Sequence, residues 1–223
     1  MIVPVVPRVW LKEIANGHTL GTSAPKAWTD WVATGSYRPL ASESTTIIRS
    51  QEEQLPDTPL KRELLEAVYD HFKNAPLAFE AFAARIFGMH DQRVMIDKIT
   101  RASVDGGRDA IGRYLLGLSD DPVYAEFSLE AKCYRPPLSG EGANTVGVRE
   151  VSRLISRIRH REFGVLVTTS VVGRQAYEEV RADRHPIVFL TGKDIANILT
   201  TNGFNTLERV TALLEQEFPV DVG

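Results

Sequence analysis

Two segments after residue 58 place apolar residues at helical spacing. In residues 60–72 these are Leu60, Leu64, Val68 and Phe72, and the sequence AFEAFAARIFG repeats the pattern at 78–88, after Pro76. Apolar positions three or four residues apart fall on one face of a helix, and proline is tolerated in a first helical turn. The pattern therefore predicts two amphipathic helices at the start of the main domain.

The next part of the chain changes to the period of β-strands. The segments 93–103 and 109–117 flank a glycine-rich turn, and 123–134 follows as a third candidate strand. Short runs of this kind, separated by glycine and aspartate, favour antiparallel pairing between neighbours in sequence. We expect a β-meander of three strands.

The downstream half alternates between helical and short apolar segments. We expect helices at 147–163, 174–184, 193–203 and 207–218, with buried strands at 164–170 and 186–192. A strand, helix, strand, helix order implies parallel pairing. Together with the meander, this order predicts an α/β fold with a central mixed β-sheet flanked by helices.

Residues 1–58 have a different composition from the remainder. They are rich in Ser, Thr, Pro and Gly and contain all three tryptophans. We interpret 1–58 as an N-terminal appendage or linker region and 59–223 as the main domain.

The overall composition is that of a compact soluble protein, with 43% hydrophobic and 25% charged residues among 223. A single cysteine cannot form an internal disulfide, and no run approaches the roughly 18 apolar residues of a membrane span. The start of the chain lacks a secretory signal pattern. We expect a cytoplasmic protein with no membrane partner. Because the net charge is -3, any contact with DNA has to come from local clustering of the 26 Lys and Arg residues.

The candidate strand at 123–134 separates apolar from ionisable side chains. Side chains alternate between the two faces of a strand, so one face carries Phe127, Leu129 and Ala131, and the other carries Glu126, Ser128, Glu130 and Lys132. Desolvating a row of charges is costly without a partner or a metal. The polar face is therefore the first candidate site.

A second acidic group comes from the glycine turn upstream. This turn contains Asp105 and Asp109, either of which can lie beside Glu130. Phosphodiester hydrolysis suits such a set, because hard oxygen ligands hold Mg²⁺ and a lysine helps to orient the attacking water. The alternative is a salt-bridge network on an exposed face of the sheet.

These motifs resemble those of the PD-(D/E)XK nucleases, and specifically the Mrr-like branch, in which a G-G-x-D turn precedes a Q/E-x-K strand. The matching residues are Gly106, Gly107, Arg108 and Asp109, followed by Glu130, Ala131 and Lys132. The resemblance implies a restriction-endonuclease-like core with Asp109, Glu130 and Lys132 as catalytic residues. It further implies Mg²⁺ bound by Asp109 and Glu130, with Glu80 of the preceding helix as a further ligand, and double-stranded DNA as the substrate.

The resemblance extends over roughly residues 77–199 and includes the segments FGVLVTTSVV and IVFLTGKDIANIL. Other phrases are similar to the cleavage half of modified-cytosine-dependent restriction endonucleases, which place an SRA-like reader domain before the nuclease. Residues 1–58 are too short for such a reader, so we expect target choice to belong to a domain absent from this chain. Because cutting both strands requires two active sites, we also expect a homo-oligomer.

Basic residues recur every four positions in 147–163. Arg149, Arg153 and Arg157 share one face of the expected helix, and His160 follows them. Such a stripe can neutralise several phosphates, so we expect these four residues to contact DNA. The alternative is a solvated face with ion pairs to nearby Glu150 and Glu162.

Two other functions are compatible with the same sequence. One is a nuclease for DNA repair or junction resolution, which would need the same catalytic residues. The other is a DNA-binding subunit whose inherited site no longer catalyses cleavage. A cleavage assay on methylated, unmethylated and branched DNA separates these possibilities.

Overall fold

The computed structural model describes residues 33–34, 46–99, 108–138 and 144–220. The chain divides into two compact units, Met1–Thr46 and Ile47–Gly223, and the fold described below is that of the second unit. The three tryptophans and the turn residues Asp105, Gly106 and Gly107 lie outside the described residues. The proposed boundary between residues 58 and 59 stays a prediction.

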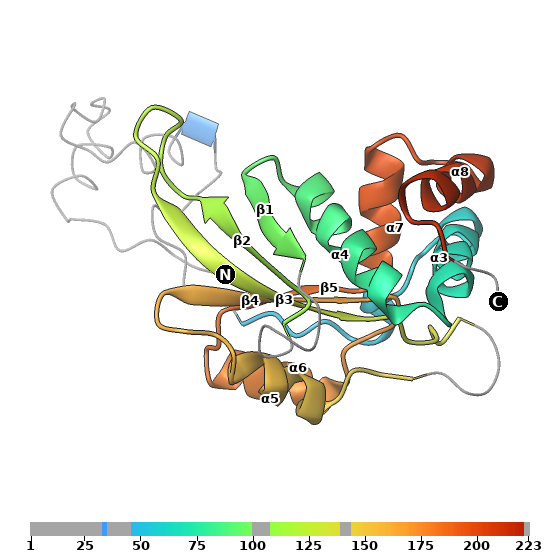
Figure 1. Ribbon diagram of the computed structural model, residues 1–223. Coiled ribbons are helices and arrows are strands. Elements are labelled where there is room, and N and C mark those ends of the chain that lie inside the picture. The colour runs from blue at the N-terminus through green and yellow to red at the C-terminus, as the bar shows by residue number, and fades with distance from the viewer. Residues whose placement is uncertain (1–32, 35–45, 100–107, 139–143, 221–223) are drawn as a thin grey trace, which may run out of the picture. The chain divides into compact units, whose positions relative to one another are not determined.

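A five-stranded mixed sheet forms the centre of this unit (Figure 1). Its strands lie side by side in sequence order: β1 (Val94–Ile99), β2 (Ala110–Leu115), β3 (Tyr124–Lys132), β4 (Glu162–Thr168) and β5 (Ile187–Leu190). The first three strands pair antiparallel, and β3, β4 and β5 pair parallel. Both the predicted meander and the predicted mixed sheet are confirmed.

Helices cover both faces of the sheet, as Figure 1 shows. One face carries α3 (Pro59–Phe72), α4 (Pro76–His90), α7 (Gly192–Thr201) and α8 (Leu207–Glu217), and the other carries α5 (Val148–Ile155) and α6 (Arg174–Ala182). A short 3-10 helix, η1 (Glu52–Gln54), precedes them in the chain. In the described part of the chain, no helix has the length and apolar character needed to cross a membrane.

Separate apolar clusters fill the two sides of the sheet. The cluster under α3, α4, α7 and α8 includes Phe72, Phe82, Phe127 and Leu129, all at most 2% exposed. The cluster under α5 and α6 includes Leu166 of β4. Because burying apolar surface contributes about 25 cal/mol per Å², these contacts hold the helices on the sheet. They bury both faces of β3 along its second half.

Local sequence signals account for several helix starts. The Thr58 hydroxyl accepts a hydrogen bond from the backbone N–H of Lys61 at 3.4 Å, and Pro59 occupies the first helical position of α3. Thr206 accepts from Arg209 N–H in the same way at the start of α8. A threonine hydroxyl satisfies one of the backbone N–H groups that a helix start leaves unpaired.

The helix predicted at 147–163 is wrong in length, because α5 ends at Ile155. The hydroxyl of Ser156 donates to the carbonyl of Arg153 at 2.8 Å, and Arg161 has a left-handed backbone with φ of 71°. The chain turns here because β4 begins at Glu162, where it must run parallel to β3. Arg157 therefore lies in the α5–β4 connection and does not continue a helical stripe.

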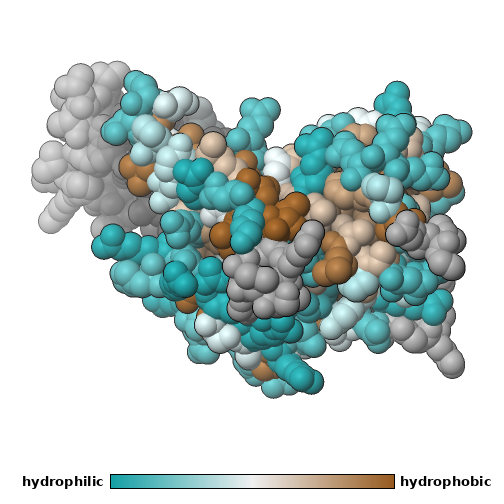
Figure 2. Space-filling view, viewed as in Figure 1, coloured by the Kyte–Doolittle hydropathy of each residue, from teal (hydrophilic) through white to brown (hydrophobic). Residues whose placement is uncertain are grey.

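The surface in the view of Figure 2 is mostly hydrophilic, with apolar side chains gathered over β1 near its centre. On β1, Met95 is 44% exposed and Ile99 is 47% exposed. β1 is an edge strand of the sheet. Its position at the edge explains why the apolar side chains of this strand are less covered than those of β3.

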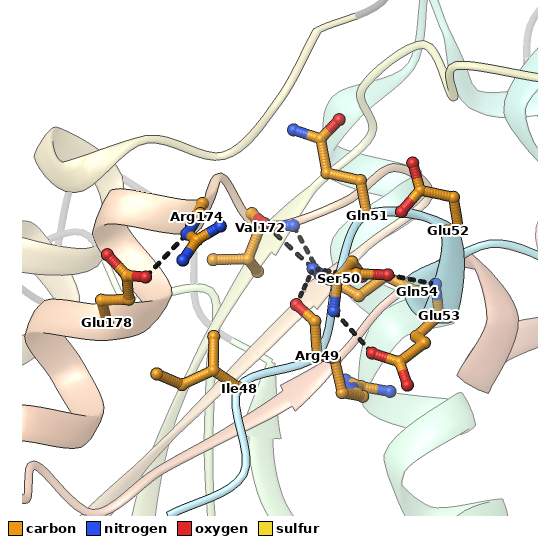
Figure 3. A pocket seen from close by; sticks show the side chains of 10 residues that line it. All are labelled: Ile48, Arg49, Ser50, Gln51, Glu52, Glu53, Gln54, Val172, Arg174 and Glu178. Carbon is orange, nitrogen blue, oxygen red and sulfur yellow. Dashed lines mark hydrogen bonds and ion pairs between the residues drawn. The ribbon is translucent and has the colours of Figure 1, made fainter.

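The segment 47–55 packs against the ends of β4 and β5 and beside α6. It lines one side of a hollow of about 410 Å³ whose other side is formed by Val172, Arg174 and Glu178 (Figure 3). Gln54, only 1% exposed, binds the backbone of Val172 through both ends of its amide: Val172 N–H donates to Oε1 at 2.8 Å, and Nε2 donates to the carbonyl at 3.1 Å. The Gln54 amide thus makes with the Val172 backbone the same two kinds of hydrogen bond that a neighbouring β-strand would make.

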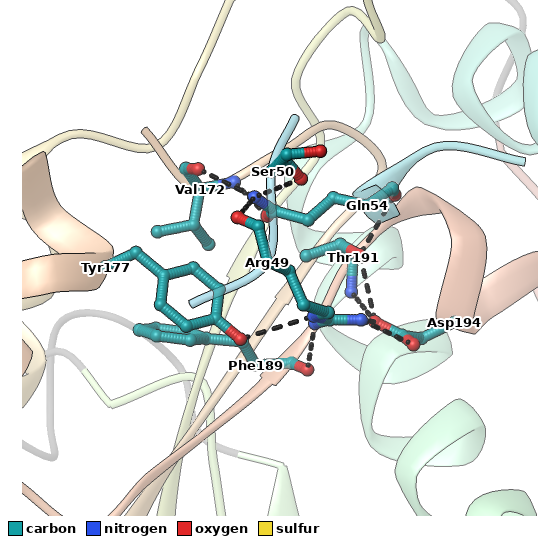
Figure 4. A network of polar contacts seen from close by, with 8 residues as sticks. All are labelled: Arg49, Ser50, Gln54, Val172, Tyr177, Phe189, Thr191 and Asp194. Atoms are coloured by element: carbon teal, nitrogen blue, oxygen red, sulfur yellow. Dashed lines mark hydrogen bonds and ion pairs between the residues drawn. The ribbon is translucent and has the colours of Figure 1, made fainter. Parts of the chain in front are cut away.

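An arginine fixes the beginning of the same segment (Figure 4). One nitrogen of Arg49 donates to both carboxylate oxygens of Asp194 at 2.9 Å, and a second donates to the Phe189 carbonyl at 3.1 Å. Its Nε donates to the Tyr177 hydroxyl at 3.2 Å. Residues far apart in the sequence are therefore joined by one partly buried network.

We predict that Gln54→Ala lowers the free energy of unfolding by about 2 kcal/mol, because it leaves the buried N–H and carbonyl of Val172 without their partner. Gln51→Ala, at an exposed position in the same segment, is the control and should change it by less than about 0.5 kcal/mol. Urea unfolding of both variants measures the difference. Equal effects would contradict the role given to Gln54.

Candidate active site

The carboxylate of Asp109 is held against strand β3. The residue directly precedes β2, and its backbone N–H donates to the carbonyl of Leu129 at 3.0 Å. Its Oδ2 accepts a hydrogen bond from the backbone N–H of Ala131 at 2.7 Å, and the residue is 7% exposed. The antiparallel β2–β3 register thus places Asp109 beside the Glu130–Lys132 end of β3.

Glu130 is completely buried and is surrounded by cations. Its Oε1 accepts from the ammonium of Lys132 at 2.7 Å and lies 3.9 Å from Nε of Arg153. Its Oε2 accepts from the guanidinium of Arg157. The charged groups therefore enclose a buried carboxylate, whereas the alternative from the sequence was an ion-pair network on an exposed face.

The buried setting changes the proton affinity of the neighbouring acids. Burial raises the pKa of Asp109, with a contribution from the nearby charge of Glu130, against the hydrogen bond from Ala131 and the charges of Lys132 and Arg157. Burial and the charge of Asp109 raise the pKa of Glu80 to about 7, although Lys132 lowers it. Glu80 of α4 is thus within electrostatic range of the other two carboxylates.

The oxygen atoms around Lys132 suit a hard cation. The ammonium contacts Glu130 Oε1 at 2.7 Å and the carbonyl of Ala131 at 3.1 Å, while Ala131 N–H occupies only one oxygen of Asp109. Carboxylate and carbonyl oxygens are the ligands that Mg²⁺ and similar ions prefer. In the described residues, no three acidic, His or Cys side chains are placed to hold one ion together. The oxygen atoms of Asp109, Glu130 and Ala131 are of the kind that binds a divalent metal ion. The role of Glu80 as a further metal ligand stays a prediction.

The residues expected to contact DNA differ in their exposure to solvent and in their contacts. Arg149 and His160 are exposed, and the side chain of Arg153 is 53% exposed. The side chain of Arg157 is 13% exposed and is directed at Glu130. The sequence assigned Arg157 to a helical stripe, so its contact with the acidic site was missed.

Arg108 is a further residue whose role the sequence did not reveal. Its guanidinium donates to the backbone carbonyl of Arg157 at 2.8 Å and lies 3.8 Å from the carboxylate of Glu162. It therefore ties the segment of Asp109 to the α5–β4 connection. The position of Arg108 next to Asp109 in the G-G-x-D motif was the one feature of the sequence that could have indicated this role. Another buried polar residue, Ser128, has no hydrogen-bond partner for its hydroxyl among the described residues.

The sequence of this region matches the restriction endonuclease family Mrr_cat over residues 73–199, a span that includes Asp109, Glu130 and Lys132. The chain belongs to this family. The restriction-endonuclease-like fold and the Mrr-like resemblance are thereby confirmed. Members of the Mrr_cat family are nucleases that typically use a divalent metal ion.

Two solved structures are similar to this Mrr_cat domain. The DNA modification-dependent restriction endonuclease AspBHI aligns with a TM-score of 0.71 and 43% sequence identity, covering 95% of this chain and 53% of AspBHI. The MspJI restriction endonuclease in complex with a 27-mer oligonucleotide aligns with a TM-score of 0.68 and 26% identity, covering 93% of this chain and 48% of MspJI. The chain spans about half the length of both proteins. None of the curated proteins compared with it matched.

We predict that Glu80→Gln stabilises the metal-free Mrr_cat domain at pH 8 more than at pH 5. The folded state raises the pKa of Glu80 from 4.5 to about 7, so its ionisation disfavours folding increasingly as the pH rises between these values, and the amide removes this cost. Thermal unfolding in EDTA at both pH values measures the effect.

Glu63→Gln, at an exposed position on α3, is the control for the loss of a surface charge. If Glu80→Gln changes the melting temperature equally at both pH values, then neither burial nor the charge of Asp109 raises the pKa of Glu80 in the folded state.

Proposed function

We propose that this Mrr_cat domain is a metal-dependent DNA endonuclease and the cleavage module of a modification-dependent restriction enzyme. The observation that supports it most is the position of Asp109, directly before β2, beside Glu130 of the neighbouring strand β3, with Lys132 in contact with Glu130 at 2.7 Å. The similarity to AspBHI over 95% of this chain supports the modification-dependent class. Double-stranded DNA is the proposed substrate.

The proposed metal ion is Mg²⁺, held by Asp109 and Glu130 with Glu80 as a further ligand. When bound, such an ion stabilises charge on the phosphate and lowers the pKa of a water molecule. Lys132 orients the attacking water and balances the charge of Glu130. Ala131 keeps Asp109 in place through its backbone N–H, because that hydrogen bond fixes one carboxylate oxygen.

We further propose that target choice lies outside the nuclease fold. The chain corresponds to about half of AspBHI and of MspJI, which leaves room in such proteins for a separate reader domain of the SRA-like type. A homo-oligomer would bring together the two active sites needed to cut both strands. We also propose that this protein acts in the cytoplasm, as suits an enzyme whose substrate is DNA.

We predict that Lys132→Ala lowers the rate of Mg²⁺-dependent DNA cleavage by about 100-fold or more, because the attacking water loses its orienting group. Lys73→Ala, which removes an exposed ion pair with Asp70 at the end of α3, should cleave at the wild-type rate. The assay uses supercoiled plasmids with and without modified cytosine, and a branched duplex.

A wild-type protein that cuts no better than Lys132→Ala would exclude catalysis at this site and favour a DNA-binding subunit. Selective cutting of the branched duplex would favour junction resolution. Preferential cutting of the modified plasmid requires a reader domain. Equal cutting of both plasmids would therefore argue only against a reader in this protein and would leave the proposed cleavage activity standing.

The exposed basic residues near the site are proposed as contacts for the DNA backbone. Arg149 and Arg153 lie on α5, and His160 lies in the connection to β4. Each cation that neutralises a phosphate releases counterions, and affinity then falls as salt rises. Arg157 shares this region of the chain but is ion-paired with Glu130.

We predict that Arg149→Ala weakens DNA binding by a similar factor for all sequences and lowers the slope of log K against log salt by about 1. Arg209→Ala on α8, on the other side of the sheet, should leave the slope unchanged. Fluorescence anisotropy in EDTA, where no cleavage occurs, measures both. A reduced affinity with an unchanged slope would indicate that Arg149 does not contact phosphate.

A further inference from the structure

Both oxygens of the buried Glu130 carboxylate are occupied by basic side chains. Lys132, on the same strand, donates a hydrogen bond to Oε1. Arg157, in the α5–β4 connection, donates one to Oε2. Arg153 is more distant from Oε1, at 3.9 Å, and is more exposed. A cation that uses Glu130 as a ligand must therefore share or replace one of these contacts.

The backbone of Arg157 is fixed at this position from two sides. Its N–H donates to the carbonyl of Leu154 at 3.0 Å, which closes the turn after α5. Its carbonyl accepts from Arg108 at 2.8 Å, and Arg108 directly precedes Asp109. The same short segment thus supplies both the acid of the site and the support for Arg157.

We propose that Arg157 is a positioning residue that neutralises Glu130 when no metal is bound and competes with the divalent ion for this carboxylate. The inference rests on the proposed function, in which Asp109 and Glu130 are metal ligands. It assigns Arg157 a role inside the metal site, distinct from that of the exposed DNA-contacting residues.

Charge balance supports the competition. Asp109 and Glu130 provide two buried carboxylates, and the two partly buried cations Lys132 and Arg157 are hydrogen-bonded to Glu130, with Arg153 farther away at 3.9 Å. A buried carboxylate without a counter-charge is strongly unfavourable, so Arg157 stabilises the metal-free fold. The same positive charge repels a divalent ion a few ångströms away, and the low dielectric of the interior strengthens that repulsion.

The experiment compares Mn²⁺ affinity by titration calorimetry in wild type, Arg157→Met and Arg157→Lys. We expect Arg157→Met to bind Mn²⁺ about 10-fold more tightly, because it removes the competing charge and keeps an unbranched, flexible side chain. Arg157→Lys retains the charge and should bind close to wild type. DNA is left out, so the result does not depend on cleavage.

Arg49→Met is the matched control, because Arg49 also forms a partly buried ion pair with a carboxylate, Asp194, but outside the site. It should lower the melting temperature without changing Mn²⁺ affinity. This comparison separates an effect on the metal from a general loss of stability.

Thermal unfolding in EDTA is the second measurement. Arg157→Met should melt at a lower temperature than wild type, and adding Glu130→Gln to it should recover much of the loss, because the amide removes the buried charge that Arg157 neutralises. If Arg157→Met does not fold, Arg157→Lys paired with Arg157→Gln provides the same comparison of affinity.

Three outcomes distinguish the possibilities. Tighter Mn²⁺ binding in Arg157→Met with unchanged affinity in Arg49→Met supports the proposal. Unchanged or weaker binding in Arg157→Met overturns it while leaving the metal site in place. Absence of Mn²⁺ binding in wild type and all variants removes the proposed metal site itself, and the role of Arg157 with it.

Discussion

The structure of the site depends on burying one carboxylate, that of Glu130, inside a folded domain. A carboxylate that loses its water must find counter-charges, and no single element supplies them all. Strand β3 contributes Lys132, and the turn after α5 contributes Arg157. The packing of α5 on the sheet is therefore coupled to the electrostatics of the site, and a change in either one affects the other.

The sheet order explains how these groups reach one another. β3 pairs antiparallel with β2 and parallel with β4, so it receives Asp109 from one neighbour and the α5–β4 connection from the other. Helix α4, packed on the opposite face, brings Glu80 within electrostatic range of Asp109. A mixed sheet with a central strand of this kind allows acids and bases from distant segments to converge at one end of β3.

The same contacts balance the charges of the two acids within the protein itself. Lys132 and Arg157 neutralise Glu130, and the hydrogen bond from Ala131 fixes Asp109. In the proposed metal site, stability and metal affinity would place opposing demands on the same basic side chains, because a counter-charge that stabilises the carboxylates also repels a cation. Residues at the active sites of enzymes are often under such opposing demands.

The sequence by itself determined the order of helices and strands, since apolar periodicity follows from which side chains face the core, and the motif spacing indicated Asp109, Glu130 and Lys132. It did not determine the end of α5, because only the requirement that β4 run beside β3 forces the chain to turn after Ile155. The partner of Arg157 was decided by the same turn. Contacts between residues distant in sequence depend on how the layers pack, and a one-dimensional pattern does not contain that information.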